Sequence, residues 1–145
     1  MAVVTASLFV PVTRVPEFEE LKNWLQEALS ALGFVVNRVT VGVNLVGTSD
    51  LLSNMIYIFD HERNVCCWVT FLSADDCLLE EDEFGMPFIA HISGSVGEGR
   101  HLALAVSYSV GVGGGGKVVY DDGCLYFDDQ KGAAKLEDIR SMCEM

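Results

Sequence analysis

The chain has 145 residues, 50% of which are hydrophobic, and its 21 acidic and 9 basic side chains give a formal net charge of −12. This length predicts one domain, since single domains commonly hold about 100–200 residues, and such a chain can fold without disulfides or metals. The charge repels nucleic-acid phosphates and anionic membranes, so we expect neither as a partner, and it favours a protein with a basic surface.

The cysteines and the N-terminal residues indicate in which cellular compartment the protein is expected. An odd number of cysteines without repeated spacing is not typical of a disulfide framework, so we expect buried, reduced thiols. Residues 1–10 lack a basic region and a cleavage site, and they predict a first strand instead of a signal peptide. No apolar run approaches the roughly 18 residues of a membrane span. We therefore expect a cytoplasmic protein. The cysteines are Cys66, Cys67, Cys77, Cys124 and Cys143.

The first third of the chain predicts a strand, a helix and a second strand. Ala2–Val10 is rich in strand-forming residues, and Pro11 is expected to end it. Pro16 is expected to begin a helix, since proline fits the first helical position, and Gly33 is expected to end it. In Phe34–Val46, valines alternate with polar residues, which predicts a long, half-buried antiparallel strand.

The middle of the chain predicts three more strands. Met55–Phe59 and Val65–Leu72 are expected to form a hairpin. The second of these is apolar on both faces, which favours a central position in the sheet. Pro87–Ser93 is expected to be another strand.

His101–Val112 alternates large apolar residues with small ones, which predicts a further strand whose large face meets the core. Lys117–Asp121 and Cys124–Phe127 are expected to form a hairpin around the turn signal Asp122-Gly123. Asp129 is expected to cap a last helix, with Leu136, Ile139 and Cys143 on its apolar side. Together these elements predict a single α+β domain over residues 1–145 with a mostly antiparallel sheet. The early amphipathic helix and the C-terminal helix are expected to pack on one face of this sheet.

The run from Gly111 to Lys117 is close to a phosphate-binding loop. That motif needs a Ser or Thr after the lysine and a helix that follows, whose N-terminus receives the phosphates. Val118 takes the place of the hydroxyl, and a strand is expected to follow. The run therefore predicts a glycine loop between two strands, and no nucleotide or other cofactor is expected.

No motif predicts catalysis or metal binding. The histidines, at positions 61, 91 and 101, lack a second ligand at metal spacing, and the carboxylates come in blocks instead of the alternation of a calcium loop. We expect no enzyme and no metal site. A nucleophile pair formed only in space, of Cys67 or Ser93 with His91, stays open as the alternative of a small enzyme with a spatially assembled site.

The strongest functional signal is an acidic segment between two strands. A run of acids is also typical of a solvated face, but here apolar residues lie within and beside it, as in binding hot spots. Complementary charge speeds association with a basic protein. We therefore expect this segment, helped by Trp24 at the edge of the predicted helix's apolar stripe or by the glycine loop, to bind the partner. Its residues are Asp75, Asp76, Leu78, Leu79, Glu80, Glu81, Asp82, Glu83 and Phe84.

A stretch covering about a fifth of the chain, His101–Phe127, resembles a pattern of small bacterial toxin-immunity proteins. There, an Ala/Leu-rich element that is often a helix precedes a Gly-Gly turn, a hydrophobic pair and an Asp. The resemblance implies a compact, acidic, cytosolic protein that binds and blocks a cognate toxin, and it assigns no functional residue. The matching pieces here are Leu102–Ala105, Gly115-Gly116, Val118-Val119 and Asp121-Asp122.

The sequence thus predicts an immunity-type inhibitor without catalytic activity, directed at a toxin or effector. A secretion-type chaperone or adaptor, which would hold an extended effector peptide on apolar surface, is the main alternative.

Overall fold

The computed structural model describes residues 5–44, 54–73, 87–95, 100–122 and 133–143. In chain order these form β1 (Thr5–Val12), α1 (Phe18–Ala31), a 3-10 turn η1 (Val36–Arg38), β2 (Val39–Asn44), β3 (Met55–Asp60), β4 (Val65–Ser73), β5 (Phe88–Ser95), α2 (Arg100–Gly113), β6 (Val118–Asp122), β7 (Ala133–Lys135) and α3 (Leu136–Cys143).

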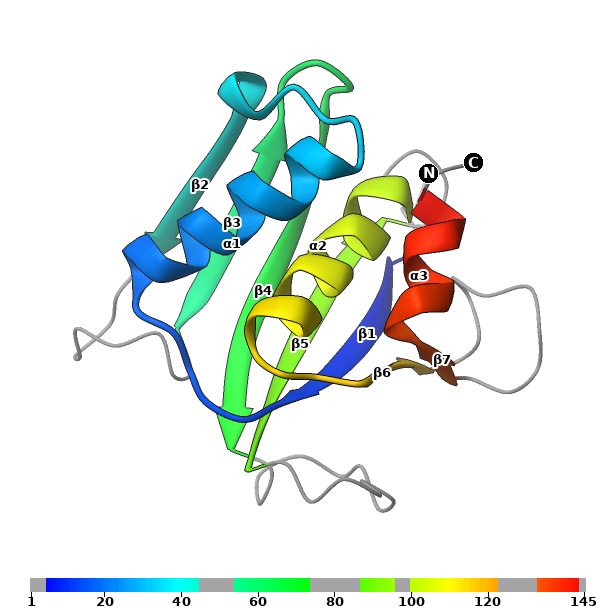
Figure 1. Ribbon diagram of the computed structural model, residues 1–145. Coiled ribbons are helices and arrows are strands. Elements are labelled where there is room, and N and C mark those ends of the chain that lie inside the picture. Colours follow the sequence, from blue (N-terminus) through cyan, green and yellow to red (C-terminus); the bar gives the residue numbers. More distant parts are fainter. Residues whose placement is uncertain (1–4, 45–53, 74–86, 96–99, 123–132, 144–145) are drawn as a thin grey trace.

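The described strands form one sheet in the order β2-β3-β4-β5-β1-β6-β7, and every pairing is antiparallel. Helices α1 and α2 lie side by side on one face, and α3 packs against α2 beside β6 and β7 (Figure 1). The α+β prediction, with a mostly antiparallel sheet and helices on one face, is confirmed.

Helix α1 follows from its sequence. Leu21, Leu25 and Leu29 recur at helical spacing and are buried against the sheet. The helix begins at Phe18, so Pro16 precedes it and does not occupy its first position. Gly33 ends it as predicted: its φ of +91° is a left-handed conformation that glycine adopts without steric cost.

Strand β1 continues through Pro11, which was expected to end it. Thr13 N–H donates to Gly114 O at 2.9 Å, on the β6 side of the strand. The N–H groups of successive residues in a strand point to alternate sides, so the nitrogen of Pro11, two residues before Thr13, also points toward β6. The β6 pairing covers only Ser7 to Phe9, so the missing N–H of Pro11 breaks no ladder hydrogen bond.

The strand predicted over Phe34–Val46 is shorter. Phe34 is buried in the core, η1 follows it, and β2 begins only at Val39. The β3–β4 hairpin is confirmed, and β4 is central, between β3 and β5.

The prediction of a strand over His101–Val112 is wrong, because this segment is helix α2. Its residues from Leu102 to Val106 are all fully buried, enclosed by the sheet, α1 and α3. A helix that is apolar all round shows no 3.6-residue period, so alternation cannot distinguish it from a strand. The small residues let the neighbouring helices approach: Gly111 lies against Leu136, and Gly113 against Trp24.

The glycine run ends α2 and leads into β6, so the predicted loop between two strands is wrong in its first half. Gly114 N–H donates to Val110 O at 2.8 Å, and Gly115 has a φ of +72°. The C-terminal end of a helix therefore faces the run. The partial negative charge of that end repels phosphate, which argues against a phosphate-binding loop.

At the end of the chain, β6 pairs with β7, and α3 is the predicted last helix, with Ile139 buried in the core. The predicted turn residue Gly123, the strand 124–127 and the cap Asp129 lie outside the described residues. One hydrophobic core lies between the sheet and the helices. No helix in the described ranges has the length and apolar character that crossing a membrane requires.

Candidate functional site

The two faces of the sheet differ. Side chains on one face join the core beneath the helices, whereas no described helix covers the other, which we call the open face. The strand registers fix its members, because alternate residues point to opposite sides. Those with described side chains are Phe9, Pro11, Thr40, Gly42, Met55, Tyr57, Phe59, Cys66, Trp68, Thr70, Leu72, Ile89, His91, Ser93, Val118, Tyr120 and Lys135, of which Pro11 and Ile89 are buried.

Two neighbouring rows cross the open face. One row runs through Gly42, Tyr57 and Trp68 on β2, β3 and β4. The next runs through Met55, Thr70, His91, Phe9 and Tyr120, from β3 to β6. Residues opposite each other on paired strands lie close enough to contact, so the register gathers separate aromatic residues into one surface.

Met55 and Tyr57 are the most exposed large hydrophobic residues on the described strands, at 51% and 45%. The Tyr57 ring lies directly over Gly42: a Cβ at residue 42 would be 2.4 Å from Tyr57 Cζ. Glycine on the edge strand therefore lets the ring lie flat across the sheet. Trp68 is half-buried beside it.

Histidines extend this flat surface. His91 stacks on Phe9 with ring centroids 4.8 Å apart and an interplanar angle of 8°. His61, just after β3, packs on Phe59 at 4.6 Å, and its Nε2 lies 2.8 Å from Thr40 Oγ1. Both imidazoles therefore contact aromatic rings of the open face.

The Cys67–His91 pair that the sequence left open does not form. Cys67 is fully buried on the helix side, whereas His91 is on the open face. Burial, and to a lesser degree the neighbouring Cys66, raise the pKa of the Cys67 thiol, which opposes formation of the nucleophilic thiolate. Ser93 does share a strand and a face with His91. Within the described ranges, no three His, Cys, Asp or Glu side chains cluster as a metal would require.

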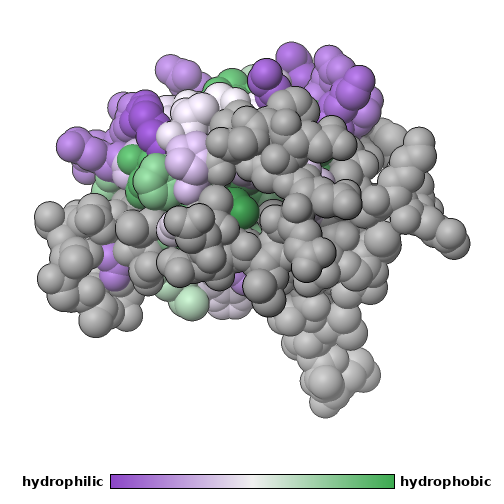
Figure 2. All heavy atoms as spheres, turned by 90° about the horizontal axis from the view of Figure 1, so that it is seen from below, coloured by the Kyte–Doolittle hydropathy of each residue, from purple (hydrophilic) through white to green (hydrophobic). Residues whose placement is uncertain are grey.

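The chemistry of the open face separates two kinds of partner. Aromatic residues on an open antiparallel sheet can stack nucleic-acid bases, but such proteins combine them with a basic groove that follows the phosphates. Among the described residues of the open face, the one basic side chain is Lys135 on the short edge strand β7, and the chain carries a charge of −12. Described hydrophilic residues gather instead along the helix side of the molecule (Figure 2). One lysine at the edge strand does not form the basic groove that follows phosphates.

The structure places Trp24 in the helix layer, on the opposite side of the sheet from the open face. Its ring packs against Gly113, where a Cβ would lie 2.1 Å from the ring, and Arg14 lies over it at 5.4 Å. With Val112 it lines a hollow of about 220 Å³ between α1 and α2. The predicted acidic site, Asp75 to Phe84, lies outside the described residues.

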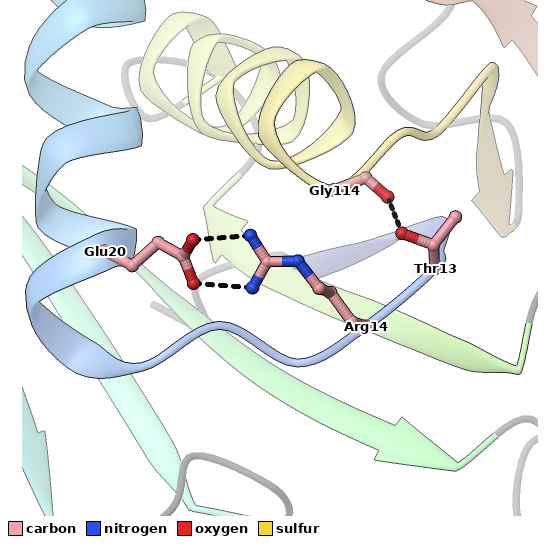
Figure 3. A network of polar contacts seen from close by, with 4 residues as sticks. All are labelled: Thr13, Arg14, Glu20 and Gly114. Atoms are coloured by element: carbon pink, nitrogen blue, oxygen red, sulfur yellow. Dashed lines mark hydrogen bonds and ion pairs between the residues drawn. The ribbon is translucent and has the colours of Figure 1, made fainter.

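A polar clasp holds the connection that leads into α1 (Figure 3). Arg14 donates two hydrogen bonds to the Glu20 carboxylate, at 2.6 and 2.5 Å, and these hold the pKa of that carboxyl below its usual range. Thr13 Oγ1 donates to Gly114 O at 2.9 Å. The clasp holds the Arg14 guanidinium beside the Trp24 ring, and Trp24 itself is partly buried.

The sequence interpretation did not identify the open face as a site. A signal was present, since the apolar residues on both faces of Val65–Leu72 already required a second apolar surface. Comparison with protein-family models, curated proteins and solved structures finds no match for this chain.

Proposed function

We propose that this chain is a non-catalytic, immunity-type binding protein that neutralises a cognate toxin or effector by docking it on the open face. The observation that carries this proposal is the one-sided helix layer, which leaves Met55 and Tyr57 exposed among half-buried aromatic residues. Tyrosine and tryptophan are the residues most enriched at binding hot spots.

Two further features support the proposal. The net charge of −12 steers a basic partner toward the molecule and repels acidic competitors. Helix α2 covers Leu102–Ala105, which agrees with the helix often found at this point in the immunity class that the sequence resembles. The acidic segment 75–84 remains the predicted electrostatic part of the surface.

Affinity capture from the cells of origin tests the proposal. The tagged chain is expected to retain a basic protein at low salt and less of it at high salt, because surface charge attraction is screened. That protein should be toxic when expressed alone and harmless when co-expressed with this chain. Retention of no basic protein, or of one whose expression is harmless, would refute the immunity assignment.

A further inference from the structure

The two edge strands of the sheet differ in how they are protected. Exposed edges invite pairing with other chains, and proteins block them with short strands, lysine, proline or bulges. β7 is three residues long and ends at Lys135. β2 has six residues, Val39–Asn44, with no charge and no proline. Its one-to-one register with β3 contains no bulge, so none of these protections is present on β2.

The backbone groups along the outside of β2 can be assigned. His61 N–H donates to Arg38 O at 2.8 Å, one step before the β2–β3 register begins. Hydrogen-bonded pairs alternate in an antiparallel ladder, so Thr40 and Gly42 bond to β3. The N–H and C=O groups of Val41 and Val43 therefore point away from the sheet, as does the C=O of Val39, whose N–H donates to Val36 O in η1. No strand of the described chain pairs with them.

A small apolar groove of about 60 Å³ lies beside this edge, beneath α1. Its lining includes Leu25, Leu29, Val39 and Val41, with Lys22 and Gln26. A strand added along β2 would hydrogen-bond to the outward groups and place every second side chain over the groove. The edge and the groove together therefore fit an extended segment of protein.

The charge at this edge is opposite to that of the molecule. Lys22 is half-buried. Its Nζ lies 5.6 Å from the centroid of the Phe18 ring, and no carboxylate among the described residues forms an ion pair with it. Arg38, immediately before β2, is exposed. A segment that carries a carboxylate complements both groups.

A second copy of this chain fits the β2 edge less well than a segment that carries a carboxylate. Pairing β2 with itself about a two-fold axis at Val41, the middle of the strand, would bring together two Lys22 side chains, because Lys22 lines the groove together with Val41. We propose that the β2 edge receives an extended segment of another protein, with apolar side chains at alternate positions and a carboxylate facing Lys22. This inference is independent of the open face.

Two synthetic peptides test it. Each has seven residues, with threonines at the odd positions and Val, Glu, Val at the even ones, and the second has Lys in place of Glu. Amide exchange followed by NMR should show the Val41 and Val43 amides unprotected in the free protein and protected by the first peptide. The Glu peptide should bind about fivefold more tightly than the Lys peptide, and Lys22→Glu should reverse this preference.

Two substitutions at Val41 distinguish the contribution of its backbone N–H to peptide binding from that of its side chain. Val41→Pro removes an outward N–H that edge strands do not need for folding, and it should abolish peptide binding, whereas Val41→Ala keeps the N–H and should retain binding. If Val41→Pro does not fold, the amide-exchange measurement on the unmodified protein still tests whether the peptide pairs with β2. Protected Val41 and Val43 amides in the free protein, no binding of the Glu peptide, equal binding of both peptides, or a dimer in sedimentation that Val41→Pro abolishes would overturn the proposal.

Discussion

Replacing Tyr57 by alanine is expected to weaken binding of the captured partner by about 30-fold or more, which corresponds to roughly 2 kcal/mol. The Tyr57 ring lies over Gly42, is 45% exposed, and stands between Gly42 and Trp68 in its row. An ordered aromatic ring offers contact area at a small entropic cost, which is why truncating it has a large effect. Isothermal titration calorimetry of the two purified proteins measures the change.

The control for this substitution is Val112→Ala. Val112 is also a strongly exposed hydrophobic residue, at 55%, but it lies on α2, in the helix layer. Its truncation should leave the affinity unchanged within about twofold, and circular dichroism should show both variants folded. The opposite pattern, in which Val112→Ala weakens binding and Tyr57→Ala does not, would move the interface to the hollow between α1 and α2.

The second large effect concerns stability and the nature of the segment 101–112. Val110→Ala is expected to lower the free energy of unfolding by about 2–3 kcal/mol, since two buried methyl groups are lost and a cavity remains. Val112→Ala should cost less than about 0.5 kcal/mol, because that side chain faces solvent. Val110 is 0% exposed. Urea unfolding of the two variants gives both values.

Comparing the Val110→Ala and Val112→Ala variants tests whether segment 101–112 is a helix or a strand. In a strand, Val110 and Val112 would share a face and their truncations would cost similar amounts. In α2 the two residues are 200° apart around the helix axis, given 3.6 residues per turn, so one is buried and the other exposed. Equal losses of stability would contradict the helix.

Much of the fold could be predicted because local signals and packing agree. α1 carries its leucines at helical spacing and ends at a glycine with positive φ, and the β3–β4 hairpin has clear strand patterns on both sides of a short turn. The prediction failed at α2, where burial on all sides removes the polar face that would reveal the helical period. It also failed at Pro11, since the tolerance of β1 for proline depends on where β6 stops pairing.

The candidate site was harder to predict than the fold. Trp24 is a predicted contact whose role stays a prediction, and in the structure its partly buried ring packs against Gly113 and lies beneath Arg14. The open face is not evident in the sequence, because its members are spread over strands β1 to β7 and come together only through the register. His91 and Phe9, for example, are 82 positions apart in the chain and stack at 4.8 Å. Single-residue patterns cannot show such neighbours.

Side-chain oxidation footprinting of the free chain and of its complex with the captured partner tests most directly whether the open face binds. Met55, Tyr57 and Trp68 should be oxidised in the free protein and strongly protected in the complex, while Trp24 should react to the same extent in both. Unchanged oxidation of Met55 and Tyr57 on binding, with protection confined to Trp24 or to other parts of the helix layer, would contradict the account.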